Sequence, residues 1–112
     1  MVRNTQRYYG DYKERCRKAH ESTGQRCVIC SKKSEEIHHS SYGNDVIGKT
    51  IFAVCRHCHE TIAHDPKNWR PNKDPMKSRN TQEFSEWLRV KYLYVCRVHN
   101  PLKGKLSYRG NK

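Results

Sequence analysis

The sequence predicts a small α+β protein in which one helix near each end flanks a central region of short strands and turns. Apolar side chains recur at helical spacing in both flanking segments. Between them lie short β-type runs, in a segment that also holds four of the six cysteines. The chain has 112 residues, about one domain's length. Because only 34% of them are apolar, the core is thin and needs a cross-link, or staple, such as a bound metal.

Residues 5–23 are predicted to form the first helix. Tyr9, Tyr12 and Cys16 lie at helical spacing, which gives the helix one apolar face. Gly24 follows where a glycine commonly caps the C-terminus of a helix. The sequence therefore predicts one amphipathic helix that ends just before this glycine.

The central segment, residues 26–64, carries both predicted strands. β-type runs occur at Glu36–His39 and Thr50–Val54, and a turn-rich stretch separates them. A short helix is expected from Glu60 and should stop near Asp65, because the next residue is a proline. The order of elements is thus strand, strand and short helix.

The remaining residues complete the single domain expected over the whole chain. Residues 65–79 contain three prolines and are predicted to form an irregular basic loop anchored by Trp69. Residues 80–99 are expected to form the second amphipathic helix, with a capping box that begins at Asn80. The basic tail, residues 100–112, is expected to be flexible.

The charge of the chain points to a polyanionic partner. Lysine and arginine outnumber aspartate and glutamate by 23 to 11, which gives a formal net charge of +12. Nucleic acid is the first expectation and an anionic membrane surface the second. No apolar run reaches transmembrane length and the first residues lack the apolar region of a signal peptide, so a cytoplasmic protein is expected, with nucleic acid and not a membrane as its partner.

Two CxxC pairs, Cys27 with Cys30 and Cys55 with Cys58, predict a structural zinc site. In a reducing compartment such cysteines are more often metal ligands than disulfides. Four thiolates can close a tetrahedral shell around Zn²⁺, which favours sulfur and imposes no geometry of its own. Zinc is therefore the expected staple of the core.

A second zinc site is an alternative for the cysteines outside these pairs. One cysteine and one histidine lie four apart on the first predicted helix, and another pair lies three apart on the second. These residues are Cys16, His20, Cys96 and His99. They can clamp the two helices through a Cys₂His₂ site, or the cysteines can be small buried apolar residues.

The 24 residues between the two CxxC pairs hold an insert with two adjacent histidines. With "CVIC", "EEIHH", "TIFAVCRHCH" and the later His64, residues 26–64 resemble the HNH endonuclease family, in the subgroup whose two CxxC knuckles bracket the catalytic hairpin. The resemblance implies a zinc-stapled ββα-metal (His-Me finger) core, a β-hairpin packed on a helix around one divalent metal. Mg²⁺, Mn²⁺, Co²⁺ or Ni²⁺ is the metal expected there.

The resemblance also implies roles for single residues. His39 matches the general base, His38 and His59 match metal ligands, and His64 falls near a further histidine that binds metal or phosphate. His64 follows His59 by five residues where four is more usual, and Thr50 stands where the family usually has an asparagine that braces the hairpin loop. Because neighbouring strand residues point to opposite faces, the strand is expected to end or bend at this histidine pair.

These roles suit phosphodiester hydrolysis, since an imidazole titrates near neutral pH and a divalent metal stabilises phosphoryl charge. We therefore expect a metal-dependent endonuclease that nicks or cleaves DNA, working as a homodimer or within a larger phage nucleoprotein machine, in a bacterial or phage-infected cell. The alternative is a non-catalytic zinc-ribbon module that binds nucleic acid, or an accessory factor of phage packaging or recombination. The expected nucleic-acid contacts are Arg56, His57, Lys67 and Arg70.

Overall fold

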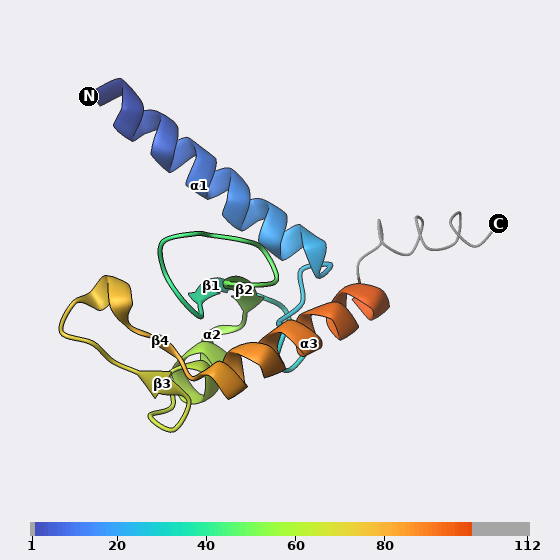
Figure 1. The fold of residues 1–112 in the computed structure, drawn as a ribbon. Coiled ribbons are helices and arrows are strands. Elements are labelled where there is room, and N and C mark those ends of the chain that lie inside the picture. Colours follow the sequence, from blue (N-terminus) through green and yellow to red (C-terminus); the bar gives the residue numbers. More distant parts are fainter. Residues whose placement is uncertain (1, 100–112) are drawn as a thin grey trace.

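The computed structural model describes residues 2–99, with side chains from residue 11 onward, so the predicted tail at 100–112 lies outside the described residues. It is a small mixture of helices and strands with two small antiparallel sheets (Figure 1). The elements are α1 (Val2–Ser22), β1 (Glu36–His39), β2 (Ile51–Val54), α2 (Arg56–Cys58), η1 (His59–Ala63), β3 (Trp69–Arg70), η2 (Pro75–Lys77), β4 (Arg79–Asn80) and α3 (Gln82–His99). In this part of the chain, no helix combines the length and the apolar character needed to cross a membrane.

Helix α1 begins earlier than predicted but ends at the expected glycine. The Gly24 N–H donates to the Glu21 carbonyl at 2.9 Å and the Gln25 N–H donates to the His20 carbonyl at 2.8 Å. This is the Schellman pattern, and Gly24 has the left-handed φ of 64° that the pattern requires. A Cβ atom on Gly24 would lie 2.0 Å from the carbonyl oxygen of His99, so the ends of α1 and α3 pack backbone to backbone.

Strands β1 and β2 form an antiparallel hairpin in which His38 pairs with Phe52 and His39 with Ile51. The predicted strands are confirmed to within one residue. Strand β1 ends at His39 as expected, yet both histidines still lie in the paired part of the strand. Their side chains therefore point to opposite faces, with His38 fully buried and His39 partly exposed.

The loop between these strands is braced by Thr50, the residue at the position where the resemblance places an asparagine. The Thr50 hydroxyl accepts a hydrogen bond from the Val46 N–H at 2.8 Å and donates one to the Asn44 carbonyl at 2.8 Å. Gly48 in the same loop lies against Tyr92 of α3, because a Cβ atom there would come within 2.5 Å of the tyrosine ring. The loop is thus fixed both internally and from outside.

The core lies between β2, the two cysteine pairs and one face of α3. All four residues of β2 are buried, and Phe52 is fully enclosed. Phe84 and Leu88 of α3 pack into the same cluster as Cys27 and Cys58. The predicted thin core is therefore built directly around the cysteines.

The helical segment at the second cysteine pair starts at Arg56, between the two cysteines and earlier than the predicted Glu60. The Cys55 thiol accepts a hydrogen bond from the Cys58 N–H at 3.4 Å and so caps the N-terminus of α2. The chain then continues into η1, a π-helical turn in which the His64 N–H donates to the His59 carbonyl at 3.2 Å. The hairpin β1–β2 is thus followed directly by a short helical segment.

The prediction of an irregular loop over 65–79 is wrong in part, because β3 and β4 pair as a second hairpin, with Trp69 opposite Asn80 and Arg70 opposite Arg79. The prediction of a helix cap at Asn80 is also wrong. Asn80 belongs to β4, and the Thr81 hydroxyl caps α3 by accepting a hydrogen bond from the Phe84 N–H at 3.2 Å.

Candidate metal centres and the histidine pair

Four cysteines from two distant parts of the chain converge on one point. Their sulfur atoms all lie within 4.8 Å of one another, and the Cys30 and Cys55 sulfurs are 3.6 Å apart; the set is Cys27, Cys30, Cys55 and Cys58. All six cysteines are unbridged thiols. Zn–S bonds of about 2.3 Å in a tetrahedron set the sulfurs about 3.8 Å apart. The four thiols therefore fit a single zinc ion, as the sequence predicts.

Backbone N–H groups donate hydrogen bonds to two of these sulfurs and so favour their thiolate forms. The Ile29 N–H donates to the Cys27 sulfur at 3.3 Å and the Cys58 N–H donates to the Cys55 sulfur at 3.4 Å. Burial raises the pKa of Cys55, but hydrogen bonds from Cys58 and from neighbouring thiols outweigh it and lower the pKa below its usual value. Burial raises the pKa of Cys27 and Cys58. Buried thiols of this kind need a cation to ionise together.

Three histidines form a second cluster on the inner face of the first hairpin. One nitrogen from each of His38, His59 and His64 lies within 4.8 Å of the others. The Nε2 atoms of His59 and His64 are 3.2 Å apart. Trp69 of β3 covers the cluster, with its ring centroid 4.4 Å from that of His64. The predicted anchoring tryptophan therefore packs directly on the predicted metal ligands.

His38 is held in one tautomer by Asn80. Its Nε2 lies 2.5 Å from the Asn80 Oδ1, which can only accept, so Nε2 carries the proton. The Asn80 Nδ2 in turn donates to the carbonyls of Ala63 at 2.8 Å and Asn68 at 2.9 Å, which fixes the orientation of the amide. The other nitrogen of His38, Nδ1, is therefore unprotonated.

That Nδ1 atom is buried and has no hydrogen-bond partner among the described residues. Burial, as the largest cause, lowers the pKa of His38 to about 3, so the imidazole stays neutral. A buried acceptor without a partner is rare in folded proteins because its desolvation is uncompensated. An orphaned imidazole nitrogen beside two other histidines fits a divalent metal ion.

Glu36 holds His59 in a matching way. Its carboxylate lies 2.9 Å from the His59 Nδ1 and 3.0 Å from the Arg56 Nε. The hydrogen bonds from His59 and Arg56 lower the pKa of Glu36, so the ionised carboxylate accepts a hydrogen bond from Nδ1–H of His59, whose Nε2 is then unprotonated. A carboxylate behind a histidine is the usual support of a metal-ligating imidazole.

The π-helical turn accounts for the unusual spacing of His59 and His64. In an α-helix, residues four apart lie on one face, whereas a π-turn pairs residues five apart. Because η1 inserts one extra residue, His64 still faces His59, with ring centroids 4.9 Å apart. The five-residue interval thus brings the two imidazoles together.

His39 lies outside this cluster, in a separate environment on the other face of β1. Its ring is stacked with that of Tyr42, at a centroid distance of 4.9 Å, and with that of Tyr12 of α1, at 6.1 Å. The His39 Nε2 is 3.7 Å from the Asp45 carboxylate, which also pairs with Arg15 at 3.6 Å. Burial lowers the pKa of His39, and the Asp45 charge partly offsets this effect.

The structure does not gather the residues of the alternative second zinc site. Among the described side chains, which include all four of them, Cys16, His20, Cys96 and His99 are not in any group of three or more neighbouring ligands. The His20 Nδ1 lies 2.6 Å from the Ser34 hydroxyl instead. Cys96 is buried, as the apolar alternative expects.

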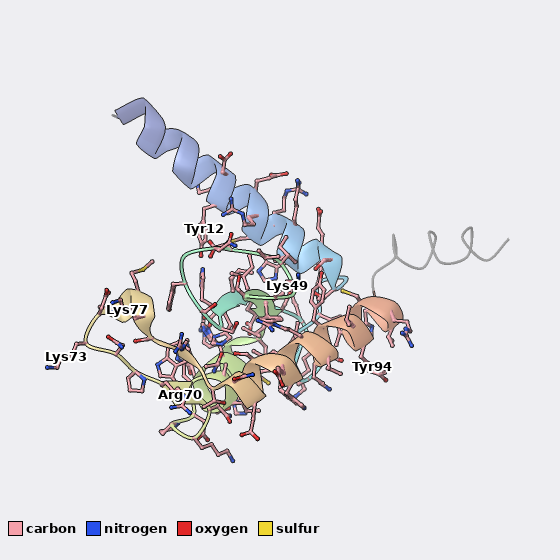
Figure 2. All side chains as sticks on the ribbon, in the orientation of Figure 1. Tyr12, Lys49, Arg70, Lys73, Lys77 and Tyr94 are labelled. Atoms are coloured by element: carbon pink, nitrogen blue, oxygen red, sulfur yellow. The ribbon has the colours of Figure 1, made fainter. Side chains whose placement is uncertain are left out.

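The four expected nucleic-acid contacts are all exposed: Arg56, His57, Lys67 and Arg70. Of these, Arg56 is engaged by Glu36, and Arg70 lines a surface cavity. Figure 2 shows Arg70 on the β3–β4 hairpin, on the same side of the molecule as Lys73 and Lys77.

Sequence reasoning missed three residues of these sites, Asn80, Glu36 and Asp45. Asn80 is 42 positions from His38, and its place before a helix gave it the pattern of a cap. Glu36 was detectable, because it lies two residues before His38 on a strand and so shares its face. Asp45 lies in a loop, where no periodicity indicates its direction.

No family model, curated protein or solved structure matches this chain. The two clusters are compatible with a zinc-binding module. The HNH assignment stays a prediction from the resemblance.

Proposed function

We propose that this protein is a metal-dependent endonuclease of the HNH type that hydrolyses phosphodiester bonds of DNA. The observation that carries the proposal is the Nδ1 atom of His38, which is buried without a partner among the described residues and lies beside His59 and His64. The next residue, His39, lies on the other face of β1, in a separate environment. A module that only binds nucleic acid has no need of this arrangement. The basic surface of the chain supplies the affinity for the polyanionic substrate.

His39 is the general base in this proposal. Asp45 faces its Nε2, which leaves Nδ1 to accept a proton from the attacking water. The two tyrosine rings restrict the imidazole to one plane, so the base is held in position before the substrate arrives. Water attacks phosphorus, its proton passes to His39, and the bond to the 3′ oxygen breaks, with a solvent proton neutralising the leaving oxygen.

His38, His59 and His64 hold the divalent metal in this proposal. The metal, when bound, stabilises negative charge on the phosphoryl and leaving oxygens as a Lewis acid. Asn80 holds His38, and Glu36 holds His59, in the tautomer that directs an unprotonated nitrogen toward the metal position. Imidazole ligands favour Mn²⁺, Co²⁺ or Ni²⁺ over Mg²⁺ in affinity.

The test is nicking of supercoiled plasmid by purified protein with Mg²⁺, Mn²⁺ or Ni²⁺. Loss of a general base lowers the rate by about 10²–10⁴-fold, which is the expectation for His39→Ala. The same variant should still bind metal, whereas His38→Ala should lose both metal binding and activity.

His20→Ala is the matched control, because His20 belongs to neither cluster and its Nδ1 lies against the Ser34 hydroxyl. It should cut like the wild type. If wild type and His39→Ala nick equally and are insensitive to chelator, the hydrolytic proposal is wrong and the non-catalytic zinc-ribbon alternative takes its place.

A further inference from the structure

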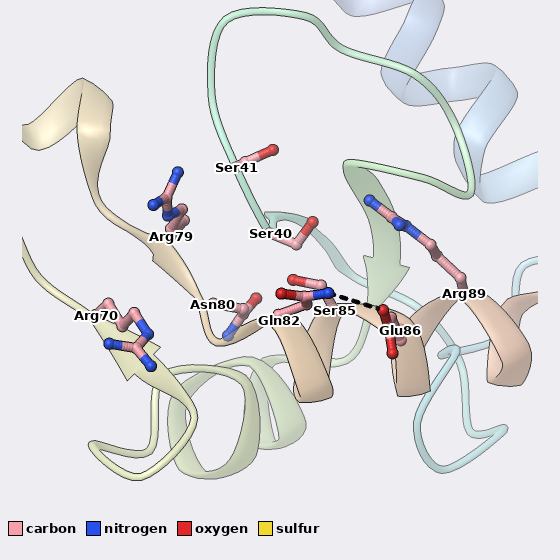
Figure 3. A pocket seen from close by; sticks show the side chains of 9 residues that line it. All are labelled: Ser40, Ser41, Arg70, Arg79, Asn80, Gln82, Ser85, Glu86 and Arg89. Carbon is pink, nitrogen blue, oxygen red and sulfur yellow. Dashed lines mark hydrogen bonds between the residues drawn. The ribbon is translucent and has the colours of Figure 1, made fainter.

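A cavity of about 600 Å³ opens beside the histidine cluster, between the β3–β4 hairpin and the first turns of α3. Three arginines line it, Arg70, Arg79 and Arg89, together with polar residues and one carboxylate, that of Glu86 (Figure 3). The Gln82 side chain donates a hydrogen bond to Glu86 at 3.3 Å. Three guanidinium groups thus share this cavity with a single carboxylate.

Within residues 11–99, the three arginines have no anionic partner of the kind that such a cluster normally has. Arg70 and Arg79 are directly opposite each other in the antiparallel hairpin, where like charges are destabilising. No ion pair formed by residues 11–99 involves any of the three. In the described part of the chain, Arg89 donates only to the Lys49 backbone carbonyl, at 3.1 Å. A polyanion would relieve this repulsion.

The cavity is tied to the histidine cluster by the same hairpin. Asn80 lines the cavity and also fixes His38, and its strand partner Trp69 packs on His64. Ser40, which follows the histidine pair, lines the cavity from the other side. Residues next to the proposed metal ligands therefore form part of the cavity wall.

A second cavity, of about 420 Å³, continues the first. The two share Ser41 and Arg79 as lining residues, and the second extends to Lys77 and Tyr42, the ring that stacks on His39. Together the cavities form a basic groove that runs from α3, past Asn80 and Tyr42, which contact His38 and His39, to the turn around η2. The groove is open to solvent and more extended than a site for a single small anion.

We propose that this groove binds consecutive backbone phosphates of the DNA strand adjoining the scissile bond, through Arg70, Arg79 and Arg89. This inference rests on the proposed function for the identity of the strand. Arginine suits the role because its planar fork donates two parallel hydrogen bonds to a phosphate. The contacts are to the backbone, so they position the strand without reading its sequence.

Binding of a short labelled DNA duplex to His39→Ala protein, followed by fluorescence anisotropy over a range of salt concentrations, tests the inference. Each arginine that contacts a phosphate should contribute about 0.9 to the slope of log K against log salt. Arg70→Gln, Arg79→Gln and Arg89→Gln should each reduce the slope by that amount and weaken binding several-fold. Arg79→Lys keeps the charge and should keep the slope.

Arg97→Gln is the matched control, since Arg97 is exposed near the other end of α3, the helix that carries Arg89. It should leave the slope unchanged. Glu86→Gln should strengthen binding, because it removes the opposing charge from the groove wall. The inference is overturned if the groove variants behave like Arg97→Gln, or if inorganic phosphate at equal phosphate concentration displaces the duplex, which would indicate a site for a free anion.

Because binding is measured without hydrolysis, the two proposals fail separately. If the protein binds DNA through these arginines but never nicks it, the groove proposal stands and the endonuclease proposal is refuted. If nicking depends on His39 but neither nicking nor binding depends on the groove arginines, only the groove proposal is refuted.

Discussion

At the scale of single residues, His38 combines full burial with one nitrogen that has no partner in the described part of the chain. A polar atom in this position costs roughly 1–3 kcal/mol of stability unless something binds it. The fold retains this cost while satisfying the other nitrogen through Asn80. Such a buried atom without a partner is typical of a site that is preorganised for its ligand.

The buried imidazole predicts a pH dependence of stability. The pKa of His38 is about 3 in the folded state and near 6.5 when the residue is exposed, so below pH 6.5 the unfolded chain binds a proton that the folded chain does not. Stability should fall by about 1.4 kcal/mol for each pH unit between 6.5 and 3. Urea unfolding from pH 8 to pH 5 measures this effect.

His38→Gln is the comparison that isolates this contribution, since both proteins carry the same thiols. The variant should lose less stability on acidification than the wild type. Equal slopes for the two proteins would contradict the assignment of a buried neutral imidazole.

Asn80 supports His38 and predicts a loss of metal affinity when removed. Asn80→Ala deletes the hydrogen bond that fixes the His38 tautomer, and removal of such a support lowers metal affinity by about 10–100-fold. Titration with Ni²⁺ of protein that already carries zinc at the thiolates measures the change. Asn68→Ala is the control, because its side chain contacts the Ile62 carbonyl and not a histidine; equal losses in both variants would argue against the supporting role of Asn80.

At the scale of elements, the π-turn η1 makes a specific prediction. If it arises from one inserted residue, deletion of exposed Thr61 should restore an α-helical turn and keep the two histidines on one face, now four apart. Metal affinity should then stay within a few-fold of the wild type. Insertion of an alanine after Thr61 should rotate His64 away and lower the affinity.

The two length variants are compared in the same Ni²⁺ titration. A deletion that abolishes binding, or an insertion that leaves it unchanged, would show that the π-turn does not set the direction of His64. Circular dichroism on both proteins checks that the remainder of the fold is retained.

The elements also show what the sequence can predict. Strand β1, the cysteine pairs and the cap at Gly24 were predictable because each depends on local spacing or on one residue's backbone preference. The β3–β4 hairpin was not, since its strands are two residues long and proline-rich flanks resemble a loop. Its Asn80 acts through a contact 42 residues away, which no local pattern encodes.

At the scale of the whole molecule, zinc is expected to determine whether the chain folds. The core cluster includes Cys27, Cys55 and Cys58 themselves, so loss of the metal leaves buried thiolates or a disrupted core. Structural zinc contributes apparent free energies of roughly 10–16 kcal/mol in small zinc domains, comparable to a typical stability of 5–15 kcal/mol. Removal of zinc should therefore unfold most of the protein.

Circular dichroism during chelation and re-addition of zinc checks this expectation. Elemental analysis of the folded protein, washed with a weak chelator, should give about one zinc per chain at the four thiolates. A value near two would place a second zinc at the histidine cluster, the other group of ligands that the described residues bring together. A chain that keeps its full helical signal without zinc would contradict the proposed staple.

The pairing of the first hairpin has a consequence for how the two neighbouring histidines differ. A slip of one residue between β1 and β2 would move His39 into the buried position of His38 and turn His38 to the opposite face. Both alternatives contain the same side chains, so composition alone does not choose between them. The Thr50 hydroxyl and the close packing of Gly48 on Tyr92 fix the loop and with it the register, which determines which imidazole joins the buried cluster and which lies beside Asp45.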